Sequence, residues 1–226
     1  MRNRNLKWLK AALTGCMLAA AGTATGLIGV AHAATIVSPG TVINNTLGEF
    51  GTRPAAAAID QSGLSVTYSS GVTDFSTYIG LSPSHGSATA DQWLSALGNT
   101  TGTIDFDLAS TFPLNRILLW NHSGQIGTAG AGINGLTVFT SNVSDFSTSV
   151  NVGTFSALSQ TNPVQVFNFN QVTNAQFVRL QINSNHGNAS FTGAPELAFA
   201  TPEPTTALLF ASGLAALAVG RRRMSR

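Results

Sequence analysis

Short stretches of alternating apolar and polar residues fill positions 103–199 and constrain the fold most. The clearest is 103–108, in which every second residue is apolar. Similar stretches follow at 116–120, 135–140, 152–155, 164–169, 177–182 and 196–199. Side chains of a strand point alternately to two faces, and no long helical pattern separates these stretches. They predict an all-β, antiparallel β-sandwich or jelly roll. We also interpret 64–68 as a strand and 90–97 as a short helical turn.

The segment between the two chain ends has no disulfide and is acidic. The chain's one cysteine, Cys16, lies near the N-terminus, so the segment must be held together by its core. Residues 34–201 carry three arginines against eight carboxylates, a net charge of −5, although the full chain has +2. The segment also has no lysine. This composition argues against nucleic-acid binding, which needs clustered basic residues.

The N-terminus has the pattern of a secretory signal peptide, predicted to be helical and to span 1–33. Its basic residues are Arg2, Arg4, Lys7 and Lys10. An apolar stretch follows, and Ala31 and Ala33 form an A-x-A cleavage site that makes Ala34 the first mature residue. A bacterial lipobox ending at Cys16 is the alternative. Only five residues separate Lys10 from Cys16, which is shorter than the usual apolar stretch of about 7–15 residues.

The C-terminal segment, 201–226, has three parts in order. Pro202, Glu203 and Pro204 come first, the uncharged apolar run 205–220 is next, and Arg221, Arg222 and Arg223 follow. As a helix the sixteen-residue run spans about 24 Å, short for a bilayer core of about 30 Å. This order resembles the PEP-CTERM sorting signal. The resemblance implies processing by an exosortase and delivery to the cell surface, outer envelope or exopolysaccharide matrix of a Gram-negative bacterium. A simple tail anchor is the alternative.

The order of the alternating stretches resembles the discoidin or coagulation-factor C-type module, a galactose-binding-like sandwich. The matching pieces are 57–60, 104–108, 114–120, 135–141, 164–169, 177–183 and 195–199. The resemblance implies one sandwich domain over 34–200, flanked by the signal helix and a short C-terminal transmembrane helix at 205–220. Gln61 stands where the family usually has glycine, and 69–102 does not align with the family.

The resemblance also implies a structural calcium ion between the early Ala-Ile-Asp loop and the last strand. Those positions fall on Asp60 and Glu196, with Ser62 and backbone carbonyls as further donors. Calcium binds six to eight oxygens, so two carboxylates are a small set. In the alternative interpretation Asp60 caps a turn and Glu196 faces solvent.

Carbohydrate binding needs an aromatic face and short polar side chains around it. Loop residues of these types are Tyr78, His85, Asn121, His122, Asn185, His186 and Phe191. The segment 183–188 is dense in amides, but asparagine and glycine also form turns without any ligand. Trp93 and Trp120 are either sugar contacts or core residues, and Trp120, which lies on a predicted strand, is expected in the core.

Nothing in the sequence predicts catalysis. The histidines are scattered, and neither a nucleophile elbow nor a His-x-x-x-His helix is present. Asp105 and Asp107 share a strand face, which suggests either a paired-carboxylate site or, as we expect, two solvated side chains. Arg179 is expected to anchor a buried carboxylate or carbonyl.

We therefore expect a non-enzymatic exported protein whose sandwich contacts surface polysaccharide or mediates adhesion. Two alternatives remain: a structural matrix protein without a small ligand, and an accessory binding subunit of a separate enzyme.

Overall fold

The computed structural model describes residues 33–122, 128–159 and 162–203, without the side chains of 171–174. The Pro204 position, the arginines Arg221, Arg222 and Arg223, and the cleavage residue Ala31 lie outside these ranges, as do the predicted signal and tail helices. Within the described residues, no helix combines the length and the apolar character needed to cross a membrane.

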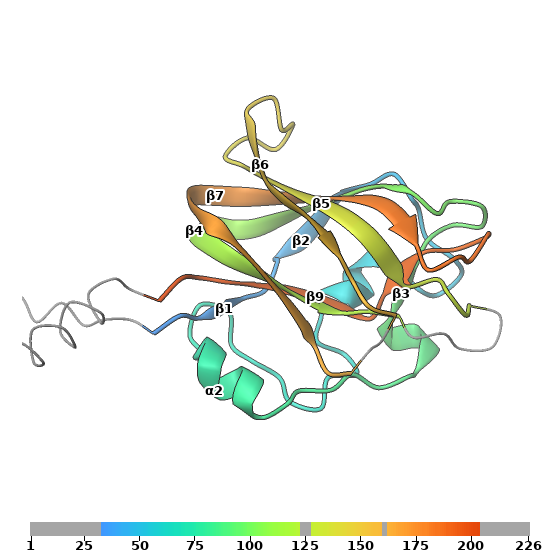
Figure 1. Ribbon diagram of the computed structural model, residues 1–226, viewed down its shortest axis with the longest axis horizontal. Helices are drawn as coiled ribbons and strands as arrows, with labels where there is room; N and C mark the ends of the chain where they lie inside the picture. Colours follow the sequence, from blue (N-terminus) through green and yellow to red (C-terminus); the bar gives the residue numbers. More distant parts are fainter. Residues whose placement is uncertain (1–32, 123–127, 160–161, 204–226) are drawn as a thin grey trace, which may run out of the picture. The chain divides into compact units, whose positions relative to one another are not determined.

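The predicted antiparallel β-sandwich is confirmed (Figure 1). The strands are β1 (Ile36–Val37), β2 (Thr41–Asn45), β3 (Trp93–Leu94), β4 (Gly102–Trp120), β5 (Ile133–Ser141), β6 (Ser149–Ser156), β7 (Gln165–Asn185), β8 (Gly193–Ala194) and β9 (Glu196–Ala200). Three short helices accompany them: η1 (Ala55–Ala58), α2 (Phe75–Gly80) and η2 (Thr89–Asp91). Within the described residues, these strands pair with one another in antiparallel fashion.

The two long strands β4 and β7 belong to both layers of the sandwich. Residues 102–107 of β4 pair with β2 and with the end of β7, which in turn pairs with β5. Residues 116–120 of β4 pair with β9 and with the start of β7. Between these halves the register shifts, and Ala109 takes a φ of 61°. Each long strand therefore changes layer at an irregularity in its pairing.

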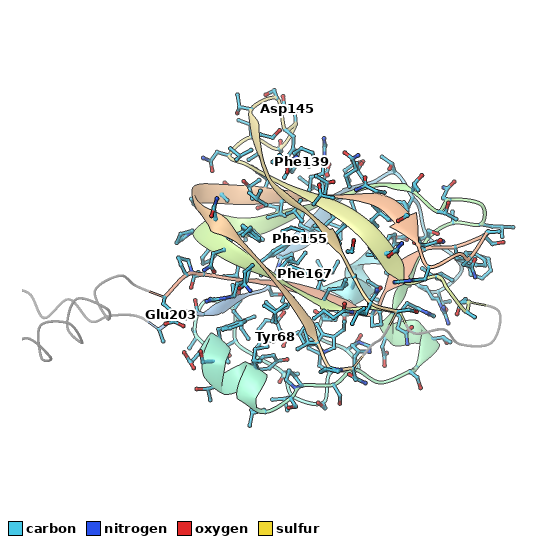
Figure 2. All side chains as sticks on the ribbon, in the orientation of Figure 1. Tyr68, Phe139, Asp145, Phe155, Phe167 and Glu203 are labelled. Atoms are coloured by element: carbon cyan, nitrogen blue, oxygen red, sulfur yellow. The ribbon has the colours of Figure 1, made fainter. Side chains whose placement is uncertain are left out.

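The apolar faces of both layers meet in one core. Phe106 of β4 and Phe199 of β9 are fully buried, and their ring centroids lie 6.3 Å apart in an edge-to-face arrangement. The open side between β6 and the start of β7 is covered by Phe155, Phe167 and Phe169, the first two of which Figure 2 shows close together. Trp120 is fully buried, as expected, and Trp93, for which both interpretations were open, is fully buried as well.

Two local predictions were wrong. Residues 64–68 form no strand; instead, Leu64 makes an isolated bridge to His85, and Tyr68 packs edge-to-face on Tyr78 in a second apolar cluster. The segment 90–97 contains only the end of η2, followed by β3. Trp93 makes the extended form favourable here, because its buried indole donates to the Gly48 carbonyl at 3.1 Å.

Candidate functional site

Three loop segments join side by side into a surface that we call the loop platform, made of residues 48–53, 94–99 and 188–192. The amide of Phe50 donates to the Leu94 carbonyl at 2.9 Å. The amides of Ser95 and Gly98 donate to the carbonyls of Thr192 and Ser190, both at 2.8 Å. The pairing of β3 with β8 continues this arrangement below the loops. The platform is thus held by backbone hydrogen bonds.

Apolar side chains project from the loop platform. The rings of Phe50 and Phe191 pack edge-to-face with centroids 4.8 Å apart. Phe50 remains 46% exposed and Leu97 69% exposed, which is unusual for side chains of this size. Phe191 is half-buried. A partly exposed aromatic pair is the kind of surface on which the apolar side of a sugar ring packs.

Sequence analysis identified Phe191 but missed its partner Phe50. Phe50 lies in an irregular stretch without strand or helix periodicity, so nothing indicated which segment it would approach. The available signal was its position between Glu49 and Gly51, since an aromatic residue beside a glycine in a turn is seldom a core residue.

Tyr78, Asn121 and His122 are buried, and their burial contradicts their prediction as sugar contacts. The Tyr78 hydroxyl donates to the Val66 carbonyl at 2.8 Å within the second apolar cluster. Asn121 donates to the carbonyls of Ile133 and Leu158 and accepts from the amides of His122 and Ile133. All its hydrogen-bonding capacity serves the fold.

The buried histidines are likewise in structural positions. Burial lowers the pKa of His122 to about 4, with the charge of Arg53 as a second cause, so this imidazole is neutral at pH 7. His85 is 4% exposed, and its Nδ1 lies 2.7 Å from the Gly86 carbonyl. Its backbone amide and carbonyl are both bound by the side chain of Asn162. The prediction that His85 contacts a sugar on the surface was therefore wrong.

The amides of the 185–188 loop make turns, as the alternative interpretation held. Asn185 donates to the carbonyls of Asn188 and Phe191, both at 2.7 Å, and accepts from the Gly187 amide. His186 is half-buried, with Nε2 2.9 Å from the Ala157 carbonyl. These residues shape the platform and hold Phe191 in place. In the structure they support the platform, whereas they were predicted to contact the sugar directly.

Asp60 and Glu196 lie at a second location, where the loop after η1 meets the start of β9. Glu196 is fully buried; its Oε2 accepts the Gln61 amide at 3.1 Å, while its Oε1 has no hydrogen-bond partner. Burial is the main cause that raises the pKa of Glu196 to about 9; the hydrogen bond from the Gln61 amide opposes the rise, and the charge of Asp60 adds to it. Glu196 is therefore not solvent-facing, and its buried Oε1 has no hydrogen-bond donor among the described residues.

Gln61 has a backbone conformation that favours glycine, the residue expected at this position from the resemblance to the discoidin module. Its φ of 63° lies in the left-handed region, which costs a non-glycine residue about 1 kcal/mol. The side chain offsets part of this cost, because its Oε1 accepts the Tyr68 amide at 2.8 Å. The turn therefore keeps its shape and presents the Gln61 amide to Glu196.

The donor chemistry of this location fits a hard cation in part. Asp60 has an exposed carboxylate, and the unpartnered oxygen of Glu196 becomes an anionic donor when this side chain loses its proton; calcium prefers oxygen donors of this type. One Asp60 oxygen already accepts the Ser62 amide at 2.8 Å, which is the turn cap of the alternative interpretation. Among the described residues, no group of three or more His, Cys, Asp or Glu side chains converges, so most other ligands would be carbonyls or water.

Asp60 also lines a groove of about 620 Å³ between the outer edge of β2 and η1. Its other lining residues are Gly40, Thr41, Val42, Ile43, Asn44, Asn45, Glu49, Ala56 and Ile59. No aromatic side chain is among them. The loop platform therefore fits a sugar ring better than this groove does.

Asp105 is buried, contrary to the expectation that it is solvated. Arg179 binds it with two hydrogen bonds, Nε to Oδ1 at 2.7 Å and Nη2 to Oδ2 at 2.8 Å, and Asn44 donates a third. The guanidinium stacks 4.2 Å from the Phe146 ring centroid. The prediction that Arg179 anchors a buried carboxylate is confirmed, and this structural pairing takes Asp105 out of any paired-carboxylate site.

Comparisons with known proteins agree with this architecture. A model of the Sad1 / UNC-like C-terminal family matches residues 96–197, which run from the loop platform to the start of β9. No curated protein gives a significant match to the sequence.

Solved structures that resemble this chain include three sets of family 32 carbohydrate-binding modules. The module of Clostridium perfringens NanJ in complex with galactose is 13% identical with a TM-score of 0.51, covering 74% of this chain and 98% of that one. The Streptococcus pneumoniae EndoD module is 14% identical with a TM-score of 0.52, covering 74% and 99%. The two C. perfringens ZmpB modules in complex with GalNAc are 16% identical with a TM-score of 0.52. That match covers 74% of this chain, which spans only 35% of the ZmpB chain. Identities this low show a shared fold.

Proposed function

We propose that this chain is an exported carbohydrate-binding protein that binds a hexose through its loop platform. The observation that carries the proposal is the contact of the exposed Phe50 with the half-buried Phe191 on a surface held by backbone hydrogen bonds. The NanJ and ZmpB modules, which share the fold, are described as complexes with galactose and GalNAc. These two sugars are therefore the first ligands to test.

We propose binding without catalysis. Two groups with catalytic chemistry, His122 and Asp105, are buried in structural contacts, and burial keeps His122 neutral. The loop platform itself presents aromatic and aliphatic carbon. Such a surface holds a sugar ring by packing, and the one carboxylate of the platform, Glu49, accepts a hydrogen bond from the Ala55 amide at 2.8 Å.

Replacing Phe50 or Phe191 by alanine should weaken galactose or GalNAc binding by at least about tenfold, equivalent to about 1.4 kcal/mol. Isothermal titration calorimetry on the exported protein measures the change, after a glycan array has identified the best ligand. Leu81→Ala is the matched control, because Leu81 is exposed but lies outside the loop platform. Binding that survives both phenylalanine substitutions would place the site elsewhere, and an array without any signal would favour a structural matrix protein.

Export and sorting complete the proposed function. The signal at 1–33 would release the protein from the cytoplasm, and the PEP-CTERM-like tail would hold it in the membrane until an exosortase processes it. The product would reside at the cell surface, in the outer envelope or in the extracellular matrix of a Gram-negative bacterium, in contact with surface polysaccharide.

The intact mass of the mature protein tests this route. We expect a chain that begins at Ala34 and ends near Pro204 in a host with an exosortase, and one that ends at Arg226 in a host without it. A chain that keeps Arg226 in both hosts would indicate a simple tail anchor. A lipid-modified N-terminus at Cys16 would indicate the lipobox alternative.

A structural cation forms the last part of the proposal. Asp60 and Glu196 would hold a calcium ion that neutralises the buried carboxylate and fixes the loop after η1 to β9. The unpartnered Oε1 of Glu196 supports this role.

A further inference from the structure

The first and last described segments of the sandwich bind each other beyond their strand pairing. In the pairing of β1 with β9, Ile36 lies opposite Ala200. Outside the strands, the Thr35 amide donates to the Thr201 hydroxyl at 2.8 Å, and the Thr201 amide donates to the Thr35 carbonyl at 2.9 Å. The contact between the two ends thus continues as far as the residue before Pro202.

The next contact joins Ala34 to Glu203. The Ala34 backbone nitrogen donates to Glu203 Oε2 at 3.3 Å, and the Ala34 carbonyl accepts from the Phe75 amide at 2.8 Å. Ala34 is fully buried, while Glu203 is exposed. Figure 2 shows Glu203 where the described chain ends, beside the start of β1. The nitrogen of the predicted first mature residue therefore lies against the one charged residue of the Pro-Glu-Pro motif.

A second anchor holds this end of β9. Arg116 donates from Nη1 to the Thr201 carbonyl at 3.1 Å and from Nε to Asn168 at 3.1 Å, and its guanidinium stacks 4.5 Å from the Phe75 ring centroid. Thr201 is thus bound through its amide, its carbonyl and its hydroxyl. Pro202 and Glu203 begin from a fixed position, which favours a defined contact between Glu203 and Ala34.

We propose that signal cleavage completes an ionic clasp between the Ala34 α-ammonium and Glu203, and that this clasp holds the sorting motif against the sandwich. The inference rests on the proposed export. Hydrolysis of the 33–34 peptide bond by one water leaves a carboxylate on the signal peptide and an amine on Ala34, which takes up a proton. A neutral amide donor thereby becomes a cation, and charge-assisted hydrogen bonds are roughly twice as strong as neutral ones.

The clasp gives the mature N-terminus a regulatory role. A processing enzyme that binds the Glu203 carboxylate must first displace the ammonium from it. N-terminal cleavage therefore lowers the accessibility of the C-terminal motif, so that the first processing event affects the second.

Two other charged groups lie near the clasp, and each already has partners. The Asp74 carboxylate accepts the Thr77 amide at 2.7 Å as the N-cap of α2, and this bonding with Thr77 lowers the pKa of Asp74. The Arg116 guanidinium is bound to Asn168 and Thr201. Glu203 is therefore the carboxylate within hydrogen-bond distance of the Ala34 nitrogen. Its removal should directly weaken proton binding by the amine.

The composition of the chain makes this amine easy to observe. The chain's two lysines, Lys7 and Lys10, both lie in the signal peptide, so the mature protein has one primary amine. Reductive methylation with ¹³C-formaldehyde labels that amine alone. Its protonation can then be followed by NMR in the exported protein, purified in detergent from a host without an exosortase, after N-terminal sequencing has confirmed that the chain starts at Ala34.

We expect the labelled amine of the wild-type protein to bind its proton about threefold more tightly than that of Glu203→Gln, as for an ion pair of which one partner, Glu203, is open to solvent. Because the ion pair raises the pKa of the amine above its unfolded value of about 7.7–8, the stabilisation is present below that pH and is lost as the pH rises further. Acetylation of the amine should likewise increase the unfolding constant of the wild-type protein about two- to threefold, and leave that of Glu203→Gln unchanged.

Asp145→Asn is the control, because Asp145 is an exposed carboxylate in the loop between β5 and β6. Its amine should titrate as in the wild-type protein. Equal titration of the wild-type protein and Glu203→Gln would overturn the clasp and leave the export proposal standing. A mature chain that begins elsewhere than Ala34 would overturn the proposed cleavage site and the clasp with it.

Discussion

Replacing Glu196 by glutamine should remove a large pH dependence from the stability of the metal-free protein. Burial, followed by the charge of Asp60, raises the pKa of Glu196 from its ordinary value of 4.5 to about 9. The folded protein therefore keeps a proton that the unfolded chain has lost. The stabilisation is complete below pH 4.5 and falls as the pH rises to about 9, by on the order of 4 kcal/mol between pH 5 and 8.

Denaturant unfolding at several pH values, with a chelator present, measures this effect as the difference between the wild-type protein and Glu196→Gln. Taking the difference matters because His122 acts in the opposite direction. Its folded pKa of about 4 lies below its ordinary value of 6.5, so its contribution is lost as the pH falls from 6.5 to 4. A difference between the two proteins that does not vary with pH would contradict the raised pKa of Glu196.

Calcium should act on the same residue. At pH 8 it should raise the melting temperature of the wild-type protein and leave that of Glu196→Gln unchanged, because only the carboxylate gains a partner for its buried oxygen. An unchanged melting temperature of the wild-type protein would remove the calcium proposal alone. The pH effect would remain, since it depends on burial and not on a metal.

Replacing Arg179 by alanine should destabilise the sandwich by about 3 kcal/mol, because it leaves the buried Asp105 carboxylate without its charge partner. Arg179→Lys should recover only part of this loss, since a lysine ammonium cannot form the two parallel hydrogen bonds made by Nε and Nη2. Thermal and denaturant unfolding measure both variants.

A double-mutant cycle tests whether the pair acts as a unit. Asp105→Asn should cost much less in the Arg179→Ala background than in the wild-type protein, because the charge it removes is no longer compensated. Asp145→Asn, at an exposed position, keeps a side-chain oxygen that can accept the Ser147 amide and should leave the unfolding midpoint unchanged. Additive effects of Asp105→Asn and Arg179→Ala would show that solvent screens the pair and that it contributes little.

Alternation predicted the strands well where each strand has one buried face. It located 103–108 and 116–120, but it could not show that they form one strand, because 109–113 breaks the apolar pattern at the point where β4 changes layer. It also placed Asp105 on the solvent face. The loop that brings Phe146 over Arg179 covers that face, and such long-range packing leaves no local signal.

The site was harder to predict than the fold, for a related reason. Asparagine, histidine and tyrosine occur both in sugar sites and in the hydrogen bonds that shape loops, and only the partners decide between the two. Asn121 and Tyr78 donate hydrogen bonds from their side chains to backbone carbonyls inside the domain. Phe191 is a candidate sugar contact because its ring packs on that of Phe50, which is distant in the sequence and adjacent in the structure.

The adjacency of the two domain ends determines how the sandwich can be mounted. Because β1 and the end of β9 leave together, while β3 and its neighbouring loops lie at the other end of the sandwich (Figure 1), a tether attached to either terminus pulls on the same pole. A pulling force on that tether therefore acts on the domain at a place distant from Phe50 and Phe191. Under the proposed function, attachment through either terminus would leave the loop platform directed away from the point of attachment.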